Sequence, residues 1–235
     1  MATIYVIRHG QASFGADDYD KLSPLGERQA AVAGEYFRDH GMQFDAAFSG
    51  DLLRQRETAA LALASQAQEV PHHIDPRFNE VRNDEQLEYL LPELLQADPA
   101  LKAHVERGLS SSKDYQKVIE AAFNYWVSPQ CADSRIQSWE DYSSGVRAAL
   151  REVMQSQGGG KTLAIFTSGG TIATIVSQVL GLSGAHTYQF YEPVFNCSVT
   201  QLFYSSSKTS LSYFNDRSYL QTYGARNGEN LVTYR

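Results

Sequence analysis

Apolar and polar positions near the start of the chain follow two alternating patterns. Residues 3–7 form a β-branched and aromatic run that is typical of a buried strand. After a polar loop, Ser23 and Pro24 open a stretch with helical apolar spacing, in which Ser23 is the expected N-cap and Pro24 the first helical residue. The pattern then repeats, with a short strand over 45–48 and an Ala- and Leu-rich helix over about 51–65.

This strand–helix–strand–helix order predicts an α/β fold. We expect a three-layer αβα sandwich, in which a mostly parallel central sheet is covered by helices on both faces. In sheets of this kind, ligands bind beyond the carboxyl ends of the strands. The loops that follow strands are therefore the first places to look for functional residues.

The middle of the chain departs from this alternation. Over 84–137 the pattern is helical, with segments at 85–97 and 115–127, a polar break at 110–113 and no convincing strand. We therefore predict that the whole chain, 1–235, forms a single domain that carries 84–137 as a helical cap insertion.

The strand pattern returns after this insertion. An amphipathic helix over 138–156 ends at three glycines, 158–160, and a buried strand is expected over 161–167. A further helix follows, and then an antiparallel pair of strands is expected over 198–204 and 210–214. The second part of the chain is thus predicted to complete the sheet.

Composition and charge restrict the class of protein. The 235 residues are 43% hydrophobic and 20% charged, which is enough for a proper core. The formal net charge is −7 and there is no long run of Lys or Arg, which argues against nucleic acid or an anionic membrane as a partner. Two cysteines, Cys131 and Cys197, and a start without a basic leader predict a reduced, cytoplasmic protein. The apolar helical stretch 171–182 is shorter than the ~20 residues that a membrane span needs.

Arg8, His9 and Gly10 follow the first predicted strand, where a parallel sheet delivers side chains to its ligand-binding edge. A neutral imidazole at His9 is a nucleophile, and the planar guanidinium of Arg8 matches the oxygens of a phosphate. Gly10 lets the backbone approach an anion closely. The tripeptide alone is a weak motif, and an ordinary surface loop is the alternative.

A second basic pair, Arg54 and Arg56, lies in the first turns of the helix predicted after the second strand. Positive charge at the start of a helix opposes the helix dipole, which favours a ligand role over a role in helix stability. Residues two apart lie on different faces of a helix, so the two side chains cannot both face the same way. An ordinary surface position for these arginines is the alternative.

Other candidate motifs fit worse. The segment 158–162 resembles a nucleotide-binding P-loop, but that motif needs a glycine at Gln155, and the segment precedes a strand. Asp18 and Asp20 lack the preceding apolar strand on which an aspartyl-phosphate mechanism depends. Neither cysteine begins a phosphatase loop, and no group of Cys and His has the spacing of a zinc site. We therefore expect no metal and no other cofactor.

Four segments together resemble one known family. They are the strand followed by RHG, the helix opening SPLGERQA, the segment SGDLLRQRETA and the acidic segment FNE. With them the chain resembles the histidine phosphatase superfamily, also called the phosphoglycerate mutase-like fold, over roughly residues 1–82 and 138–220. The resemblance implies that the helical insertion is the variable cap of that family.

The resemblance also implies a role for each matching residue. The histidine of RHG is phosphorylated on a ring nitrogen in the family, which implies His9 as the nucleophile and Arg8 as a phosphate clamp. The second family arginine falls on Arg54, which leaves Arg56 at the surface. The acidic proton donor falls on Glu80, whose carboxyl would have a raised pKa beside a phosphate. A solvated position in an acidic loop is the alternative for Glu80.

The chain departs from the family at one position. The second family histidine stands in an SHGG segment at a strand end, where this chain has Ser168 before two glycines. The helix start can still bind phosphate through backbone N–H groups, so Gly10, Ser168 and Gly169 join Arg8 and Arg54 as expected phosphate-binding residues. Losing one donor to a transition state lowers a rate by ~10²–10³, so activity is expected to be weak or directed at a different substrate.

Another histidine could replace the missing one. The candidates are His72, His73 and His186, although each alone is more typical of a solvated or structural residue. The aromatic residues of the insertion could line an apolar pocket, but packing within the cap is the expectation, because aromatics at helical spacing usually serve a core. They are Tyr89, Tyr115, Phe123, Tyr125 and Trp126.

The resulting hypothesis is a phosphatase that hydrolyses a small phosphomonoester through a phosphohistidine on His9. A transfer of the phosphoglycerate mutase type is the alternative reaction, and a non-catalytic phospholigand-binding protein is the alternative class. The expected partner is a small phosphorylated substrate, with no nucleic acid and no membrane. The identity of the substrate and the oligomeric state do not follow from any pattern in the chain.

Overall fold

The sheet at the centre of the fold has six strands in the order β3-β2-β4-β1-β5-β6. The computed structural model describes residues 2–13 and 20–234. The strands are β1 (Ala2–Arg8), β2 (Ala46–Ser49), β3 (His72–Ile74), β4 (Thr162–Thr167), β5 (Val199–Tyr204) and β6 (Thr209–Asp216). β1 runs parallel to β4, β4 to β2 and β2 to β3, whereas β5 runs antiparallel to β1 and β6. The prediction of a mostly parallel sheet is therefore confirmed.

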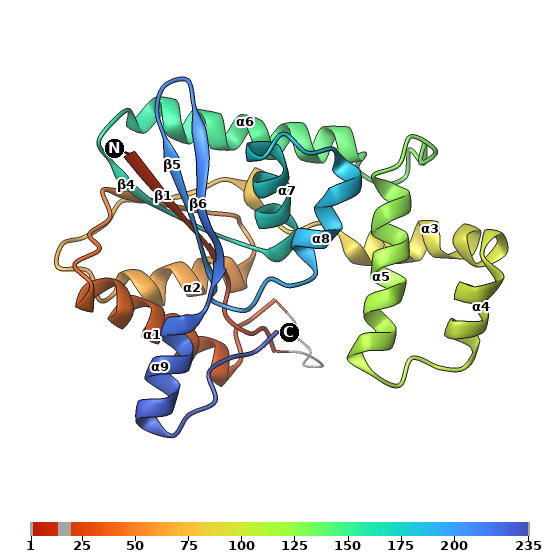
Figure 1. Cartoon of the computed structure of the whole chain (residues 1–235), viewed down its shortest axis with the longest axis horizontal. Helices are drawn as coiled ribbons and strands as arrows, with labels where there is room; N and C mark the ends of the chain where they lie inside the picture. Colours follow the sequence, from red (N-terminus) through yellow and green to blue (C-terminus); the bar gives the residue numbers. More distant parts are fainter. Residues whose placement is uncertain (1, 14–19, 235) are drawn as a thin grey trace.

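Helices connect these strands and cover the sheet (Figure 1). They are α1 (Pro24–Asp39), α2 (Leu53–Leu63), α3 (Asn83–Ala97), α4 (Pro99–Glu106), α5 (Ser112–Trp126), α6 (Trp139–Gln157), α7 (Gly169–Val179), α8 (Thr187–Tyr191) and α9 (Ser218–Asn227). Two short 3₁₀ turns, η1 (Pro76–Phe78) and η2 (Gly184–His186), complete the description. Within the described ranges, no helix combines the length and the apolar character needed to cross a membrane.

The layers follow from the alternation of side chains along the strands. On β1, Ile4 and Val6 point into one buried cluster, which also holds residues of α6 and α7. Tyr5 and Ile7 point into a second cluster, which holds residues of α1, α2 and α9. One face of the sheet is thus covered by α6 and α7 and the other by α1, α2 and α9, which is the predicted three-layer arrangement (Figure 1).

The helix boundaries agree with the capping signals in the sequence. Ser23 precedes α1, and its hydroxyl accepts a hydrogen bond from the Gly26 N–H at 3.0 Å. Pro24 is the first residue of that helix. Gly158 ends α6 with a φ of 72°, a conformation that favours glycine. The strand β3 and the helices α4, α8 and α9 were not expected from the pattern.

Helices α3, α4 and α5 lie together to one side of the sheet (Figure 1). The segments predicted over 85–97 and 115–127 are present here as α3 and α5. Phe123 and Trp126 of α5 are buried, and their ring centroids lie 6.0 and 5.3 Å from that of Trp139 at the start of α6. These two aromatic residues therefore pack α5 onto α6, and the function of the region as a cap stays a prediction.

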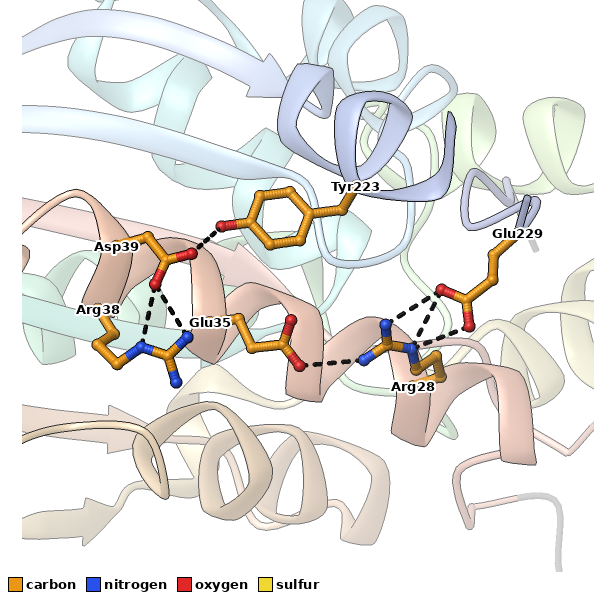
Figure 2. A network of polar contacts seen from close by, with 6 residues as sticks. All are labelled: Arg28, Glu35, Arg38, Asp39, Tyr223 and Glu229. Carbon is orange, nitrogen blue, oxygen red and sulfur yellow. Dashed lines mark hydrogen bonds and ion pairs between the residues drawn. The ribbon is translucent and has the colours of Figure 1, made fainter. Parts of the chain in front are cut away.

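The chain after β6 turns back toward the first helix. Figure 2 shows α9 and the residues after it beside α1, where Tyr223 donates a hydrogen bond to Asp39 at 2.6 Å. Arg28 of α1 forms an ion pair with Glu229 at 3.1 Å. These contacts fix the path of the segment 228–234, which we call the C-terminal segment and which continues toward the end of β1.

Candidate functional site

The predicted functional residues meet at the carboxyl edge of the parallel strands. Arg8 ends β1 and lies opposite Thr167, the last residue of β4, in the register of the sheet. The N–H of His9 donates to the Thr167 carbonyl at 2.8 Å, so the loop after β1 leaves the sheet directly beside the loop after β4. The loops after these two strands therefore lie together at the edge of the sheet where ligands of α/β folds bind.

Two glycines let this loop lie against the start of α1. A Cβ atom on Gly10 would lie 2.5 Å from the Gly26 carbonyl oxygen, and one on Gly26 would lie 2.1 Å from the Gln11 carbonyl oxygen. Backbone atoms occupy both positions, so a side chain fits at neither. The Gly10 N–H also donates to the hydroxyl of Thr58 on α2 at 3.0 Å. The loop is thus held by both helices that follow it.

His9 carries a neutral imidazole of defined tautomer. The ring is almost fully buried, at 5% exposure, with Nδ1 2.6 Å from the Gly10 carbonyl oxygen and Nε2 3.2 Å from Nε of Arg54. Because Arg54 Nε is a donor, Nε2 accepts and the proton lies on Nδ1, which donates to the carbonyl. Burial lowers the pKa of His9 well below its usual value, and the charges of Arg54 and Arg8 lower it further.

The two arginines at the start of α2 occupy different environments. The Arg54 side chain is 11% exposed and reaches His9, and its Nη1 lies 2.5 Å from a carboxylate oxygen of Asp20. Arg56 is 42% exposed and pairs with Asp51 at 3.6 Å. The two side chains point in different directions, as expected for residues two apart on a helix, and Arg54 is the one that lies beside His9.

Arg8 is held by backbone carbonyls from the far end of the chain. Its Nη1 donates to the carbonyl oxygen of Val194, and also to that of Tyr234 at 3.0 Å. The backbone around it is fixed from the same side, because the Cys197 N–H donates to the Arg8 carbonyl at 3.1 Å and the Asn196 amide donates to that of His9 at 3.2 Å. The guanidinium is thus oriented by segments that are remote in sequence.

Glu80 follows the 3₁₀ turn η1, and its carboxyl group faces the same cluster of charges. One oxygen, Oε1, accepts from the N–H groups of Val81 and Gly170 at 3.0 and 2.9 Å. Burial raises the pKa of Glu80, while the nearby charges of Arg54 and Arg8 and these two hydrogen bonds oppose the increase. With Oε1 occupied by two donors, the other oxygen is the one available to carry a proton.

Ser168 and Gly169 stand at the start of α7, directly after β4. Ser168 is fully buried, and its hydroxyl accepts from the side-chain amide of Gln55 at 2.8 Å. A Cβ on Gly169 would lie 3.0 Å from the Tyr191 ring and 3.8 Å from Nε of Arg8, so this backbone lies beside the arginine. The N-terminus of α7 is therefore part of the cluster.

The other histidines weighed from the sequence have contacts elsewhere. Nε2 of His72 lies 2.9 Å from the Ser49 hydroxyl, and the ring of His73 lies 5.3 Å from that of Phe48. Nδ1 of His186, in the exposed turn η2, lies 2.9 Å from the Ser183 hydroxyl. These contacts belong to the β3 edge of the sheet and to η2, outside the cluster around His9.

Several residues of the site were missed by the sequence analysis. They are Asp20, Gln55, Asn196 and Tyr234, which contact Arg54, Ser168, His9 and Arg8 respectively. Asp20 had been weighed with Asp18 only as a phosphate acceptor, and Asp18 lies outside the described residues. No local signal marks Asn196 or Tyr234, because their contacts depend on the folding of the whole chain.

Cys131 and Cys197 are free thiols, and burial raises the pKa of Cys197 to about 12, far from a reactive thiolate. Among the residues that the structure describes, no group of three or more His, Cys, Asp and Glu side chains could hold a metal ion.

The cluster brings together the groups that an anion site with a nucleophile and an acid would need. Arg8 and Arg54 supply two guanidinium groups, a type of group that can bind phosphate oxygens in bidentate fashion. The neutral imidazole of His9 contacts Arg54 and lies within the influence of both charges, and burial favours the protonated form of Glu80, on which the same charges act. The start of α7 adds the positive end of a helix dipole.

Comparison with known proteins identifies the family of the chain. The model of the histidine phosphatase superfamily (branch 1) matches residues 4–217. A broad-specificity phosphatase of Saccharomyces cerevisiae is 38% identical over 72 residues, which cover 28% of this chain and 31% of that relative. This chain thus matches only about a third of that phosphatase. A 2,3-bisphosphoglycerate-dependent phosphoglycerate mutase of Streptococcus pneumoniae is 29% identical over 213 residues, which cover 78% of this chain and 86% of the mutase.

Solved structures share the fold over nearly the whole chain. YhfR of Bacillus stearothermophilus is similar with a TM-score of 0.68 at 19% identity, covering 94% of this chain and 100% of that one. A phosphoserine phosphatase mutant of Entamoeba histolytica in complex with phosphoserine is similar with a TM-score of 0.65 at 20% identity, with the same coverage. Since the family model spans most of the chain and the fold agrees, this protein belongs to branch 1 of the histidine phosphatase superfamily.

Proposed function

We propose that this protein is a phosphatase that hydrolyses a small phosphomonoester through a phosphohistidine intermediate on His9. Arg8 and Arg54 bind the phosphate, with help from the start of α7. Gly10 contributes by letting the loop approach closely, since its N–H donates to Thr58. Glu80 donates the proton to the leaving group. The superfamily contains both phosphatases and mutases, so the assignment to hydrolysis is ours.

One observation carries the proposal. Nε2 of His9 has its lone pair directed at Nε of Arg54 at 3.2 Å, in a ring whose other nitrogen donates to the Gly10 carbonyl. A buried, neutral imidazole in this tautomer is ready to attack phosphorus, because no proton has to leave Nε2 first. The guanidinium beside it marks the position at which the phosphoryl group would be bound.

The reaction would proceed in two steps. In the first, Nε2 of His9 forms a bond to phosphorus, the bond to the ester oxygen breaks, and the leaving alkoxide takes the proton of Glu80. In the second, a water molecule gives a proton to the Glu80 carboxylate and attacks phosphorus, which releases inorganic phosphate and free His9. The two arginines neutralise the charge on the phosphoryl oxygens in both steps, which is the main requirement of phosphoryl transfer.

Ser168 is the unusual element of this proposal. It stands where the family resemblance places a second histidine, and its hydroxyl hydrogen remains available for donation, since the oxygen already accepts from Gln55. With Gly169 it would line the phosphate site, without the positive charge of an imidazolium. We therefore propose an enzyme whose rate is lower than that of a relative with two histidines, by as much as ~10²–10³.

The region 84–137 would act as the cap of this single domain. It lies to one side of the sheet as a separate group of helices, and the loop that carries Glu80 leads directly into it (Figure 1). A small phosphorylated substrate is the partner that fits the site. The non-phosphate part of the substrate would lie between the cap and the edge of the sheet.

A mutase reaction is the second candidate. It is favoured by the relative from Streptococcus pneumoniae, whose alignment covers 78% of this chain. A mutase returns the phosphoryl group of the histidine to an organic acceptor, which requires that water be excluded from the site. A protein that binds phospholigands without turnover is the third possibility.

The test is metal-free turnover of a panel of phosphomonoesters, with acid-labile phosphate on the protein followed by rapid quench. His9→Ala is the essential variant, and His186→Ala is the matched control, because His186 lies in the exposed turn η2. We expect turnover and transient labelling in the wild type and in His186→Ala, and neither in His9→Ala. Transfer to phosphoglycerate in place of water would indicate the mutase. Phosphate binding without any turnover would indicate the non-catalytic protein.

A further inference from the structure

Asp20 makes two contacts at the start of α2 that the proposed reaction does not use. Its Oδ1 lies 2.5 Å from Nη1 of Arg54, and its Oδ2 accepts from the Leu53 N–H at 2.7 Å. The carboxylate therefore bridges the backbone and a side chain of the same helix. Asp20 precedes α1, 33 and 34 positions before these partners, so the contact connects two segments that are distant along the chain.

The start of α2 needs such a partner. Leu52 stands at the N-cap and provides no side-chain hydrogen bond, and the first turn holds no acidic residue but carries Arg54 and Arg56. Two positive charges at the positive end of a helix dipole are unfavourable. Asp20 supplies from outside the helix both the missing acceptor and the missing negative charge.

The same carboxylate fixes the direction of the guanidinium. The guanidinium is planar and rigid, so anchoring Nη1 on Asp20 determines where Nε points. In this structure Nε of Arg54 points to Nε2 of His9 at 3.2 Å. Three side chains are thus joined by hydrogen bonds, from Asp20, which precedes α1, through Arg54 to His9.

From this geometry we infer that Asp20 is a positioning residue, which holds Arg54 in the orientation that binds phosphate beside His9. The inference rests on the proposed phosphate site. The same contact could also weaken phosphate binding. The Asp20 carboxylate occupies one donor of Arg54 and reduces the positive charge that Arg54 offers to phosphate. If that effect dominated, removing Asp20 would strengthen the binding of phosphate.

The experiment is calorimetric titration of the purified protein with inorganic phosphate. We expect Asp20→Ala to weaken the binding by about tenfold, the loss typical of one misplaced charge-assisted hydrogen bond. Asp20→Asn keeps a single oxygen, which can accept from Arg54 or from Leu53 but not from both in their present positions, and it lacks the negative charge. We therefore expect it to bind phosphate more weakly than the wild type and more tightly than Asp20→Ala. Asp51→Asn, which removes the exposed partner of Arg56 on the same helix, is the matched control and should leave the affinity unchanged.

A double-mutant cycle separates positioning from simple capping of α2. If Asp20 acts through Arg54, Asp20→Ala causes no further loss of phosphate affinity in an Arg54→Ala background. If the carboxylate only stabilises the helix, the two losses add, and the inference is wrong. Tighter or unchanged binding of phosphate by Asp20→Ala also overturns it. A wild-type protein that binds no phosphate would instead overturn the proposed phosphate site, and this inference with it.

Discussion

Nη1 of Arg8 donates a hydrogen bond to the carbonyl oxygen of Tyr234 at 3.0 Å, across 226 positions of the chain. The contact joins the last residue of β1 to the C-terminal segment. That segment is held in turn by α1, through Arg28 and Glu229 as Figure 2 shows, and through Gln29. The orientation of Arg8, which we propose binds phosphate, therefore depends on how the C-terminal segment packs against α1.

Gln29 offers a way to test this dependence. Its side-chain amide is fully buried and donates to the Leu231 carbonyl at 2.8 Å and to the Thr233 hydroxyl at 2.7 Å. Gln29→Ala leaves these acceptors without the amide, so we expect a loss of about 1–3 kcal/mol in the free energy of unfolding. Urea denaturation measures that loss, and the exposed Gln189→Ala is the control.

We also expect Gln29→Ala to raise the KM for a phosphomonoester, because Arg8 loses a well-positioned carbonyl when the C-terminal segment loosens. An unchanged KM together with the loss of stability would show that the segment supports the fold and not the orientation of Arg8.

The two arginines of α2 are predicted to respond differently to the same change. Arg54→Lys removes the Nε–H that donates to His9 and the planar guanidinium that we propose binds phosphate, so kcat/KM should fall by ~10²–10³. Arg56→Lys changes an exposed side chain paired with Asp51 at 3.6 Å, and its effect should stay within about twofold. Steady-state measurement of kcat/KM for both variants tests this difference. Equal losses of kcat/KM in the two variants would contradict the proposal that Arg54 binds the phosphate.

The role of Glu80 predicts a dependence on both pH and leaving group. Burial raises its pKa, so the protonated acid persists above the usual range, and the hydrolysis of alkyl phosphates should slow as the pH increases through that raised value. Glu80→Gln removes the proton donor and should lower kcat for an alkyl phosphate by ~10²–10⁴. The loss should be much smaller for p-nitrophenyl phosphate, whose leaving group needs no proton. Equal losses with both substrates would assign the proton donor to another residue.

Gly170 provides a structural test of how Glu80 is held. A Cβ at this position would lie 2.5 Å from Oε1 of Glu80 and 2.7 Å from the Val81 side chain. Gly170→Ala must therefore displace the carboxyl group, and we expect a loss of about 1–3 kcal/mol in stability with a lower kcat. Gly159→Ala is the matched control, since a Cβ there meets nothing within 4 Å. Thermal unfolding and turnover of both variants test the prediction.

The parts of the fold that the sequence predicted are those determined by local rules. β1 is a continuous apolar run, and α1 begins at Ser23 because its hydroxyl caps the helix and Pro24 suits the first helical position. The different directions of the Arg54 and Arg56 side chains could be predicted, because residues two apart lie on different faces of a helix. The place of the site followed from the order of the strands.

The parts that it did not predict depend on contacts between distant segments. β3 has three exposed residues and forms only because β2 offers it an edge. No pattern around Asp20 predicts its contact with Arg54. The contact between Tyr234 and Arg8 depends on the complete sheet, on α9 and on the face of α1 that holds the C-terminal segment. Local pattern contains no information on such pairs, because each is fixed by packing between elements far apart in the chain.

The distance along the chain between Arg8 and Tyr234 also has a consequence for biosynthesis. Arg8 emerges from the ribosome early, whereas the carbonyl that orients it is made 226 codons later. β1 can pair with β4 only after Thr167 has been translated and with β5 only after Tyr204, and the C-terminal segment docks after that. The nascent polypeptide therefore carries its imidazole and guanidinium groups through the translation of 226 further positions without their final arrangement, and the site is completed only after Tyr234 has left the ribosome.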